Sequence, residues 1–323
     1  GFTDKYWLTA MIPDETMPYS ATTQYLRNAK GNEAVGVYQT DIKGKAVTLE
    51  PGESLALNQR LFAGAKVVSV LDDYRMRLGI PLFDRAVDFG GLYFLTKPIF
   101  TVLDAFYGLV GNFGIAILML TVLIKAMMYP LANKSYIAMS QMKVLMPKIK
   151  ELQERYKDDK MKMNTELMNL YRTEKVHPMS GCFPLLIQIP VFFALYKVLF
   201  VTIEMRHAPF YGWIHDLSAP DPTNLFTAFG LLDWNVPAML HVGVWPLLMC
   251  LTMVLQQRLN PKPTDPVQAQ MITYMPYVFL FMFAKFPAGL VIYYAWNNTL
   301  SIIQQRIILH RIERKKELTG HVS

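Results

Sequence analysis

One cation and several amide and hydroxyl side chains stand inside long apolar runs of this 323-residue sequence. Lys125 lies about six residues from the end of the run 112–131, or about 9 Å along a helix, and Thr121 precedes it by one turn. Ionisable groups inside apolar runs cost free energy, so each one is a candidate functional group. A lysine in this setting offers a fixed positive charge that would attract acidic groups.

Amide and hydroxyl groups at a similar depth come from two further runs. Gln188 lies almost as far from the start of its run as Lys125 lies from the end of its own. Asn298, Ser301 and Gln305 are spaced three and four residues apart, which places them on one stripe of a helix. Polar groups from three helices are therefore expected to gather at one depth.

Two interpretations of these side chains stay open. The ammonium group of Lys125 could extend to the membrane surface, and each amide could simply bond a neighbouring helix, which is worth about 0.6–2 kcal/mol. Their concentration at one end of the runs, opposite an aromatic and aliphatic end, favours a hydrated groove that is open on one side only. The predicted groove residues are Lys125, Thr121, Gln188, Asn298, Ser301 and Gln305.

The apolar runs lack the groups that most catalysis needs. They contain no Asp or Glu and no combination of Ser, His and Asp or of His, Cys and carboxylate. Intramembrane proteolysis, a metal site and a carboxylate proton relay are therefore disfavoured. Cys182 and Cys250 lie in apolar stretches rather than in a disulfide framework. The sequence predicts neither an enzyme nor a metal site nor a cofactor.

Composition predicts a membrane protein. Hydrophobic residues make up 52% of the chain and charged residues 18%, whereas a soluble domain has about 25% charged residues. The net charge of +7 would suit a nucleic-acid binder, but the mean hydropathy of +0.21 argues against that class. Five runs have, or approach, the length of about 20 residues that a helical span needs. They are residues 112–131, 182–203, 239–257, 271–286 and 290–309.

Charge asymmetry predicts the orientation of these spans. Segment 133–180 carries ten Lys and Arg against six Asp and Glu, and the tail 306–323 carries five against two. Segment 258–270 is also net positive, whereas 204–238 has one basic and four acidic residues. Because positive loops stay in the cytoplasm, the first three segments are expected to be cytoplasmic. Residues 1–88 then lie outside, in the periplasm.

Residues 1–88 have a different character from the rest of the chain. Stretches 34–38 and 45–49 are short and β-rich, and Pro51-Gly52-Glu53 predicts a turn between two strands. We expect antiparallel sheet belonging to a β-sandwich. The sequence starts at Gly1 without a leading apolar segment, so we interpret it as a fragment with an anchor or signal upstream.

Two further segments are expected to be helical without crossing a membrane. Residues 89–110 are apolar and aromatic but contain Lys97-Pro98 and Asp104, which favours an amphipathic helix in the outer interface over a span. Segment 133–180 shows apolar residues at three- and four-residue steps on both sides of Lys157-Asp158-Asp159-Lys160, which predicts an antiparallel helical hairpin. Six of its methionines either close the hairpin or accept varied apolar partners: Met139, Met142, Met146, Met161, Met163 and Met168.

Several ordered motifs resemble the YidC-type membrane protein insertases. Region 1–88 is similar to the C-terminal part of the periplasmic β-domain of Gram-negative members, and the resemblance covers nearly the whole chain. The motifs are Tyr129-Pro130-Leu131, Gly181-Cys-Phe-Pro-Leu-Leu-Ile-Gln188-Ile-Pro190, Trp213-Ile-His-Asp-Leu217, Phe286-Pro-Ala-Gly-Leu290 and Ile302-Ile-Gln-Gln305.

The resemblance implies a fold and an activity. It implies a polytopic helical membrane protein with five core helices after a first helix absent here, a cytoplasmic hairpin and a hydrophilic groove whose positive charge is Lys125. Many members have arginine there, and lysine keeps the charge without the planar fork that binds carboxylates in a bidentate way. The implied function is insertion and folding of nascent membrane proteins in the bacterial inner membrane, alone or with the Sec translocon. Ribosomes are an expected partner of the basic hairpin and tail, because ribosomal RNA is polyanionic.

Two other classes of protein would also show polar groups among apolar helices. A small-solute transporter would have a polar cavity, although usually with inverted repeats, which this sequence does not show. A structural assembly subunit of a membrane complex would not need a buried cation. Transport of solute and insertion of protein are therefore the activities to compare.

Overall fold

The computed structural model describes residues 1–13, 17–28, 35–174, 176, 183–232, 236–237, 240–260 and 266–320. Contacts divide the chain into two compact units. The first unit consists of residues 1–88 together with 201–204, and the second of residues 89–200 and 205–323. The candidate groove residues all belong to the second unit.

The first unit contains a three-stranded antiparallel sheet with the order β1-β2-β5. Its strands are β1 (Phe2–Thr3), β2 (Trp7–Ile12) and β5 (Arg60–Ala65). Helix α1 (Val68–Arg77) follows β5 and buries Leu71 completely. Glu204 also belongs to this unit, and its carboxylate accepts a hydrogen bond from the Val68 N–H at 2.9 Å. This N–H lies at the start of α1, where it has no acceptor within the helix.

The other two strands pair only with each other and form a two-stranded sheet; the expected β-sandwich stays a prediction. Strands β3 (Tyr19–Asn28) and β4 (Val35–Gly44) pair with each other along their length. Their described side chains are exposed or half-buried on both faces. Neither face of β3 is consistently apolar, since Tyr19, Ala21 and Thr23 alternate with Ser20 and Thr22. Such faces give little apolar area to bury against a second sheet.

The predicted strand at 45–49 is also wrong, whereas the turn after it is present. Gly44 pairs with Tyr19, the first residue of β3, so the chain beyond Gly44 has passed the end of its partner strand. Residues 45–50 adopt no regular structure. The Glu53 N–H bonds the Glu50 carbonyl at 3.0 Å, which closes the turn at Pro51-Gly52 outside any hairpin.

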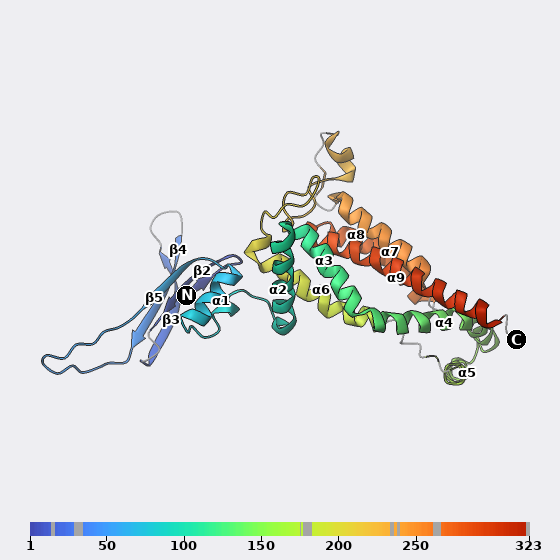
Figure 1. The fold of residues 1–323 in the computed structure, drawn as a ribbon, viewed down its shortest axis with the longest axis horizontal. Coiled ribbons are helices and arrows are strands. Elements are labelled where there is room, and N and C mark those ends of the chain that lie inside the picture. The colour runs from blue at the N-terminus through green and yellow to red at the C-terminus, as the bar shows by residue number, and fades with distance from the viewer. Residues whose placement is uncertain are drawn as a thin grey trace. The chain divides into compact units, whose positions relative to one another are not determined.

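The second unit is helical, and each predicted apolar run overlaps a helix (Figure 1), although the run 112–131 crosses a break between two helices at Met128. Helix α9 extends beyond the predicted run and includes most of the basic tail. The helices are α2 (Tyr93–Val110), α3 (Phe113–Met127), α4 (Tyr129–Arg155), α5 (Lys160–Thr173), α6 (Phe183–Val201), α7 (Val244–Leu259), α8 (Pro266–Phe283) and α9 (Ala288–Gly320).

Helices α3 and α4 follow each other with a bend of 66°. Pro130, in the first turn of α4, has no N–H to continue the hydrogen-bond ladder of α3, which accounts for the break. Among the described residues no single helix combines the length and hydropathy of a bilayer span, and only the bent pair α3–α4 passes that criterion by length and composition. Residues 188–201 and 267–283 form shorter apolar helices.

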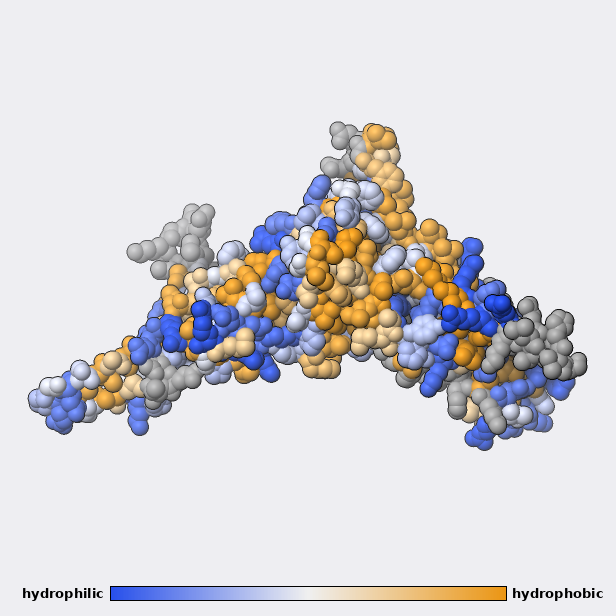
Figure 2. Space-filling view, viewed as in Figure 1, coloured by the Kyte–Doolittle hydropathy of each residue, from blue (hydrophilic) through white to orange (hydrophobic). Residues whose placement is uncertain are grey.

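Helix α9 is the central helix of the second unit. It packs against α7, α3 and α4, and its residues 288–293 are all buried. Figure 2 shows hydrophobic surface over the middle of the helical unit and hydrophilic residues toward the end that carries α4 and the C-terminal part of α9. Asn297, Asn298, Ser301 and Gln305 of α9 are buried, so these polar side chains meet other helices rather than solvent.

The predicted hairpin consists of α4 and α5, with Asp159 capping α5 through the Lys162 N–H at 3.0 Å. We name Leu145, Ile149 and Val176 the hairpin core; Met142 and Met146 pack against it. Some of the predicted hairpin methionines therefore pack inside the hairpin, whereas Met161 and Met168 are exposed. Helix α5 ends at Thr173. The sequence predicts that His177-Pro178 and Ser180-Gly181 end this helix, and these residues lie outside those that the structure describes.

Candidate functional site

Lys125 lies in the last turn of α3 and meets α9. Its Nζ donates to the Ser301 Oγ at 2.7 Å, and the Ser301 hydroxyl donates to the Asn297 carbonyl at 2.9 Å. Among the residues that the structure describes, no carboxylate forms an ion pair with Lys125. The ammonium group is therefore a half-buried cation held by a neutral hydroxyl, which leaves its charge available to an anion.

Tyr136 joins the same cluster from the far side of the α3–α4 bend. It is buried, and its hydroxyl shares a hydrogen bond with Ser301. Ser301 thus lies between a cation from α3 and a phenol from α4. One small hydroxyl on α9 links both arms of the bent helix pair.

Thr121 lies one turn before Lys125 but does not reach another helix with its hydroxyl. The Thr121 Oγ1 donates to the Ile117 carbonyl of its own helix at 2.7 Å, and the side chain is buried. This bond satisfies the hydroxyl locally, so Thr121 adds polarity next to Lys125 without forming an interhelical link.

The predicted stripe on α9 divides between two neighbouring helices. Ser301 faces α3, whereas the Asn298 Nδ2 donates to the Thr252 Oγ1 of α7 at 3.4 Å. The Gln305 Nε2 donates to the Asn260 Oδ1, just after α7, at 3.2 Å. Residues 298 and 305 are seven apart and lie almost above each other, while 301 is turned toward the adjacent face. The amides therefore tie α9 to α7, and only Ser301 meets the cation.

Gln188 lies apart from this cluster, on α6. Its Nε2 donates to the Tyr293 hydroxyl of α9, and its side chain is half-buried. Of the six predicted groove residues, Thr121, Asn298, Ser301 and Gln305 are buried, while Lys125 and Gln188 are partly exposed. The structure brings Lys125 and Ser301 together; the groove itself stays a prediction.

Sequence reasoning missed Tyr136 and Tyr293, the two phenols that bond predicted residues. For Tyr293 a signal was present, because residues 293, 297, 301 and 305 recur every four positions and all carry polar groups. For Tyr136 no simple signal existed. The bend between α3 and α4 changes which residues share a face with Lys125.

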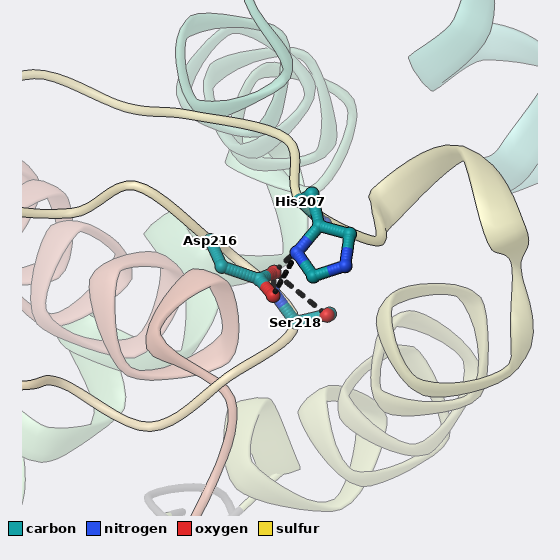
Figure 3. A network of polar contacts seen from close by, with 3 residues as sticks. All are labelled: His207, Asp216 and Ser218. Carbon is teal, nitrogen blue, oxygen red and sulfur yellow. Dashed lines mark hydrogen bonds and ion pairs between the residues drawn. The ribbon is translucent and has the colours of Figure 1, made fainter.

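A second polar cluster combines residue types found in hydrolases. Asp216 Oδ1 accepts the Ser218 hydroxyl at 2.7 Å and the His207 N–H at 3.1 Å, and Asp216 Oδ2 lies 3.2 Å from the His207 Nδ1 (Figure 3). In a catalytic triad the serine bonds the imidazole, which in turn bonds the carboxylate. Here serine and histidine both bond the carboxylate, and the serine does not bond the imidazole. The three residues therefore stabilise the local chain conformation and do not activate a nucleophile.

Both regions of the chain are similar to known protein families. A family model described as 60Kd inner membrane protein matches residues 105–316, and a model described as YidC periplasmic domain matches residues 1–102. Curated relatives named membrane protein insertase YidC include that of Methylobacterium radiotolerans, 54% identical over 318 residues, which are 98% of this chain and 51% of the relative. The relative from Rickettsia bellii is 56% identical over 308 residues, 95% of this chain and 54% of its own.

A solved structure shows the same fold. The crystal structure of an active YidC insertase, with its first transmembrane domain resolved, matches with a TM-score of 0.53 at 20% identity. The match covers 89% of this chain and 60% of that one. This chain spans about half the length of the curated relatives that it matches. By the family models that match its two regions, the chain belongs to the 60Kd inner membrane protein family, with a YidC periplasmic region before its helices.

Proposed function

We propose that this chain inserts newly made proteins into the bacterial inner membrane and assists their folding. The observation that carries the proposal is Lys125, a cation without a described carboxylate partner, which Ser301 holds between apolar helices. The relatives at more than 50% identity are curated as membrane protein insertases, which supports the same activity here.

In this proposal the helical unit lies in the bilayer. Helices α3, α6, α7, α8 and α9 are the five spans, and the hairpin of α4 and α5 lies in the cytoplasm with the end of α9. Helix α2 lies in the outer interface, where its exposed Phe94, Tyr107 and Leu109 suit the headgroup boundary. Residues 1–88 are periplasmic. The charge asymmetry of the sequence supports this orientation.

The mechanism uses the Lys125 charge to lower a desolvation cost. A nascent protein must move a hydrophilic segment across an apolar layer, which is unfavourable for every polar group without a partner. A carboxylate in that segment can replace the Ser301 hydroxyl as the partner of the Lys125 ammonium, and a charge-assisted bond is stronger than a neutral one. The polar groups near Lys125 then keep water beside the segment partway across.

The apolar helix of the substrate leaves into lipid along exposed apolar surfaces. Phe193 on α6 and Val278 and Phe281 on α8 provide such surfaces. Burying an apolar helix in lipid is favourable by about 25 cal/mol per Å² of surface removed from water. This burial supplies the driving force, and the mechanism needs no nucleotide. Ribosomes and the Sec translocon are the partners that would deliver substrates.

Reconstitution tests this function against its alternatives. The full-length protein in proteoliposomes is given a single-span substrate, and protease protection of the translocated segment is measured. We expect insertion and no flux of small solutes. Solute flux without insertion would favour a transporter, and neither activity would favour a structural subunit.

A further inference from the structure

The loop between α6 and α7 contacts the N-terminal ends of three helices. We name residues 205–224 the capping loop. The Ala288 N–H donates to the Ala219 carbonyl at 2.7 Å, and the Gly289 N–H donates to the Leu217 carbonyl at 3.0 Å. Donors in the first turn of a helix have no acceptor within that helix. The capping loop therefore supplies the missing acceptors at the start of α9.

Asp221 makes the corresponding connection to α7. Its Oδ2 accepts the Trp245 N–H at 2.9 Å, while the neighbouring Thr223 Oγ1 accepts the Val244 N–H at 3.0 Å. The other oxygen, Oδ1, accepts the Trp213 indole N–H at 3.1 Å and the Thr223 hydroxyl at 2.7 Å. Asp221 is only 5% exposed. One oxygen of this buried carboxylate thus joins the loop to a helix N-terminus, where negative charge is favoured, while the other oxygen bonds residues within the loop.

Close packing joins the capping loop to α3 and fixes the position of Asp221. A Cβ added at Gly114 would lie 1.9 Å from the Phe210 ring, so the ring rests directly on the α3 backbone. The Asn112 Nδ2, at the N-cap of α3, donates to the Pro209 carbonyl at 3.3 Å. A Cβ at Gly243 would lie 2.5 Å from the Asp221 Cγ, so the carboxylate fits only against a bare backbone.

We propose that Asp221 is a positioning residue: through it the capping loop clamps the N-terminal ends of α3, α7 and α9 together. Helices α3 and α9 then separate only at their opposite ends, where the Lys125 ammonium bonds the Ser301 hydroxyl, whereas Gln305 keeps α9 bonded to Asn260 at the end of α7. This inference rests on the proposed insertase function for its consequence, because a substrate would enter from those opposite ends. The clamp itself does not depend on a substrate and can be measured in the free protein.

The first test measures amide hydrogen exchange of the full-length protein in lipid nanodiscs. Asp221→Asn replaces one acceptor oxygen with an NH2 group that donates. The asparagine can therefore accept the hydrogen bonds of only one of the two carboxylate oxygens. We expect exchange in residues 242–250 to become about tenfold faster, as loss of a buried hydrogen bond implies. Asp216→Asn is the matched control, because Asp216 bonds His207 and Ser218 but not α7: exchange should rise within residues 205–218 and stay unchanged in residues 242–250. Equal exchange in the parent and in Asp221→Asn, or an equal effect of Asp216→Asn, would overturn the clamp.

A second variant guards against simple misfolding. Gly243→Ala keeps Asp221 but displaces its carboxylate, and its backbone φ of −82° is ordinary for alanine. It should accelerate the same amides, and combining it with Asp221→Asn should add little. Additive effects of the two substitutions would contradict a shared contact. When a ribosome–nascent chain is added, exchange should rise in residues 303–310 and stay slow in residues 286–293. The reverse pattern would contradict the proposed direction of opening.

Insertion assays separate the clamp from the proposed function. Asp221→Asn should reduce insertion of acidic and neutral substrates by the same factor, because it moves helices and not charge. A loss confined to acidic substrates would contradict a positioning role. If even the parent inserts nothing, the proposed function is wrong. The exchange measurements still show whether Asp221 holds the capping loop on α7.

Discussion

At the scale of residues, the account depends on a charge and on the hydroxyl that holds it. Lys125 and Ser301 were both candidates from the sequence, because each interrupts an apolar run. Their pairing follows from the packing of α3 on α9, which the pattern of one helix cannot specify. For the same reason the sequence put Asn298 and Gln305 beside Ser301, although they bond α7 and its end.

Lys125 should act through its charge. We expect Lys125→Arg to retain most activity, Lys125→Ala to reduce insertion of acidic substrates about tenfold or more, and Lys125→Glu to be worse than alanine. The measurement compares one substrate with its extracytoplasmic acids present or neutralised. Neutralised substrate should lose little in the alanine variant. If Lys125→Ala inserts both forms as well as the parent does, the lysine only anchors the helix at the membrane surface.

Asp216 makes the capping loop sensitive to acid. Burial alone would raise the pKa of this carboxyl, but hydrogen bonds from Ser218 and His207, with the nearby imidazole, hold the pKa below its ordinary value of 3.8. A lowered pKa contributes stability above the unfolded pKa and loses it as the pH falls through the folded value. The loop should therefore be stable at neutral pH and loosen only below about pH 4.

Exchange of the amides in residues 205–218, corrected for intrinsic rates, measures this loosening. Asp216→Asn should exchange faster than the parent at pH 7 and show no further change on acidification. A parent loop that loosens between pH 5 and 7 would point to another titrating group. An asparagine variant with the acid response of the parent would show that Asp216 is not responsible.

At the scale of elements, helices were predicted more accurately than strands. The sequence predicts the hairpin turn at 157–160, because polar residues there interrupt a strong helical pattern. Residues 45–49 suit a strand but do not form one, because a strand needs a partner. Strand β3 begins at Tyr19, opposite Gly44, and offers no partner to the residues after Gly44. The β-sandwich stays a prediction, because the described strands form a three-stranded and a two-stranded sheet.

The hairpin core should be a small, separately stable cluster. Ile149 is fully buried among Leu145, Val176 and Leu167. Ile149→Ala should cost about 2–4 kcal/mol of local stability, because it removes apolar contacts and leaves a cavity. Trypsin cleavage within α4 should become at least about tenfold faster. Met161→Ala, at a position 84% exposed, is the control and should leave cleavage unchanged.

The first unit should not be needed for insertion. It forms its own compact unit, and all the predicted groove residues belong to the other. A variant that keeps residues 89–323 behind a membrane anchor should insert a single-span substrate at a rate close to that of the parent. Membrane levels of the variant are the necessary control. Complete loss of insertion at normal levels would show that residues 1–88 take part directly.

At the scale of the whole molecule, the central claim is that nascent chains pass beside Lys125 within the helical unit. The capping loop ties the N-terminal ends of three helices together. At the other end Lys125 bonds Ser301 between α3 and α9, and Gln305 bonds Asn260 just after α7. A path that opens from the Lys125 end and stays closed at the capping loop agrees with both features. Composition and charge pattern predicted the membrane location and the side of opening, whereas the clamp required the fold.

Site-specific photo-crosslinking from the full-length protein to a stalled nascent chain tests this claim most directly. The crosslinker is placed at Gln188 and at Met128, both half-buried near the predicted groove, and at Leu251, which is exposed on α7. The account predicts adducts between the first two positions and the hydrophilic extracytoplasmic segment of the substrate, with few from Leu251. Adducts from Leu251 alone, while insertion proceeds, would contradict it.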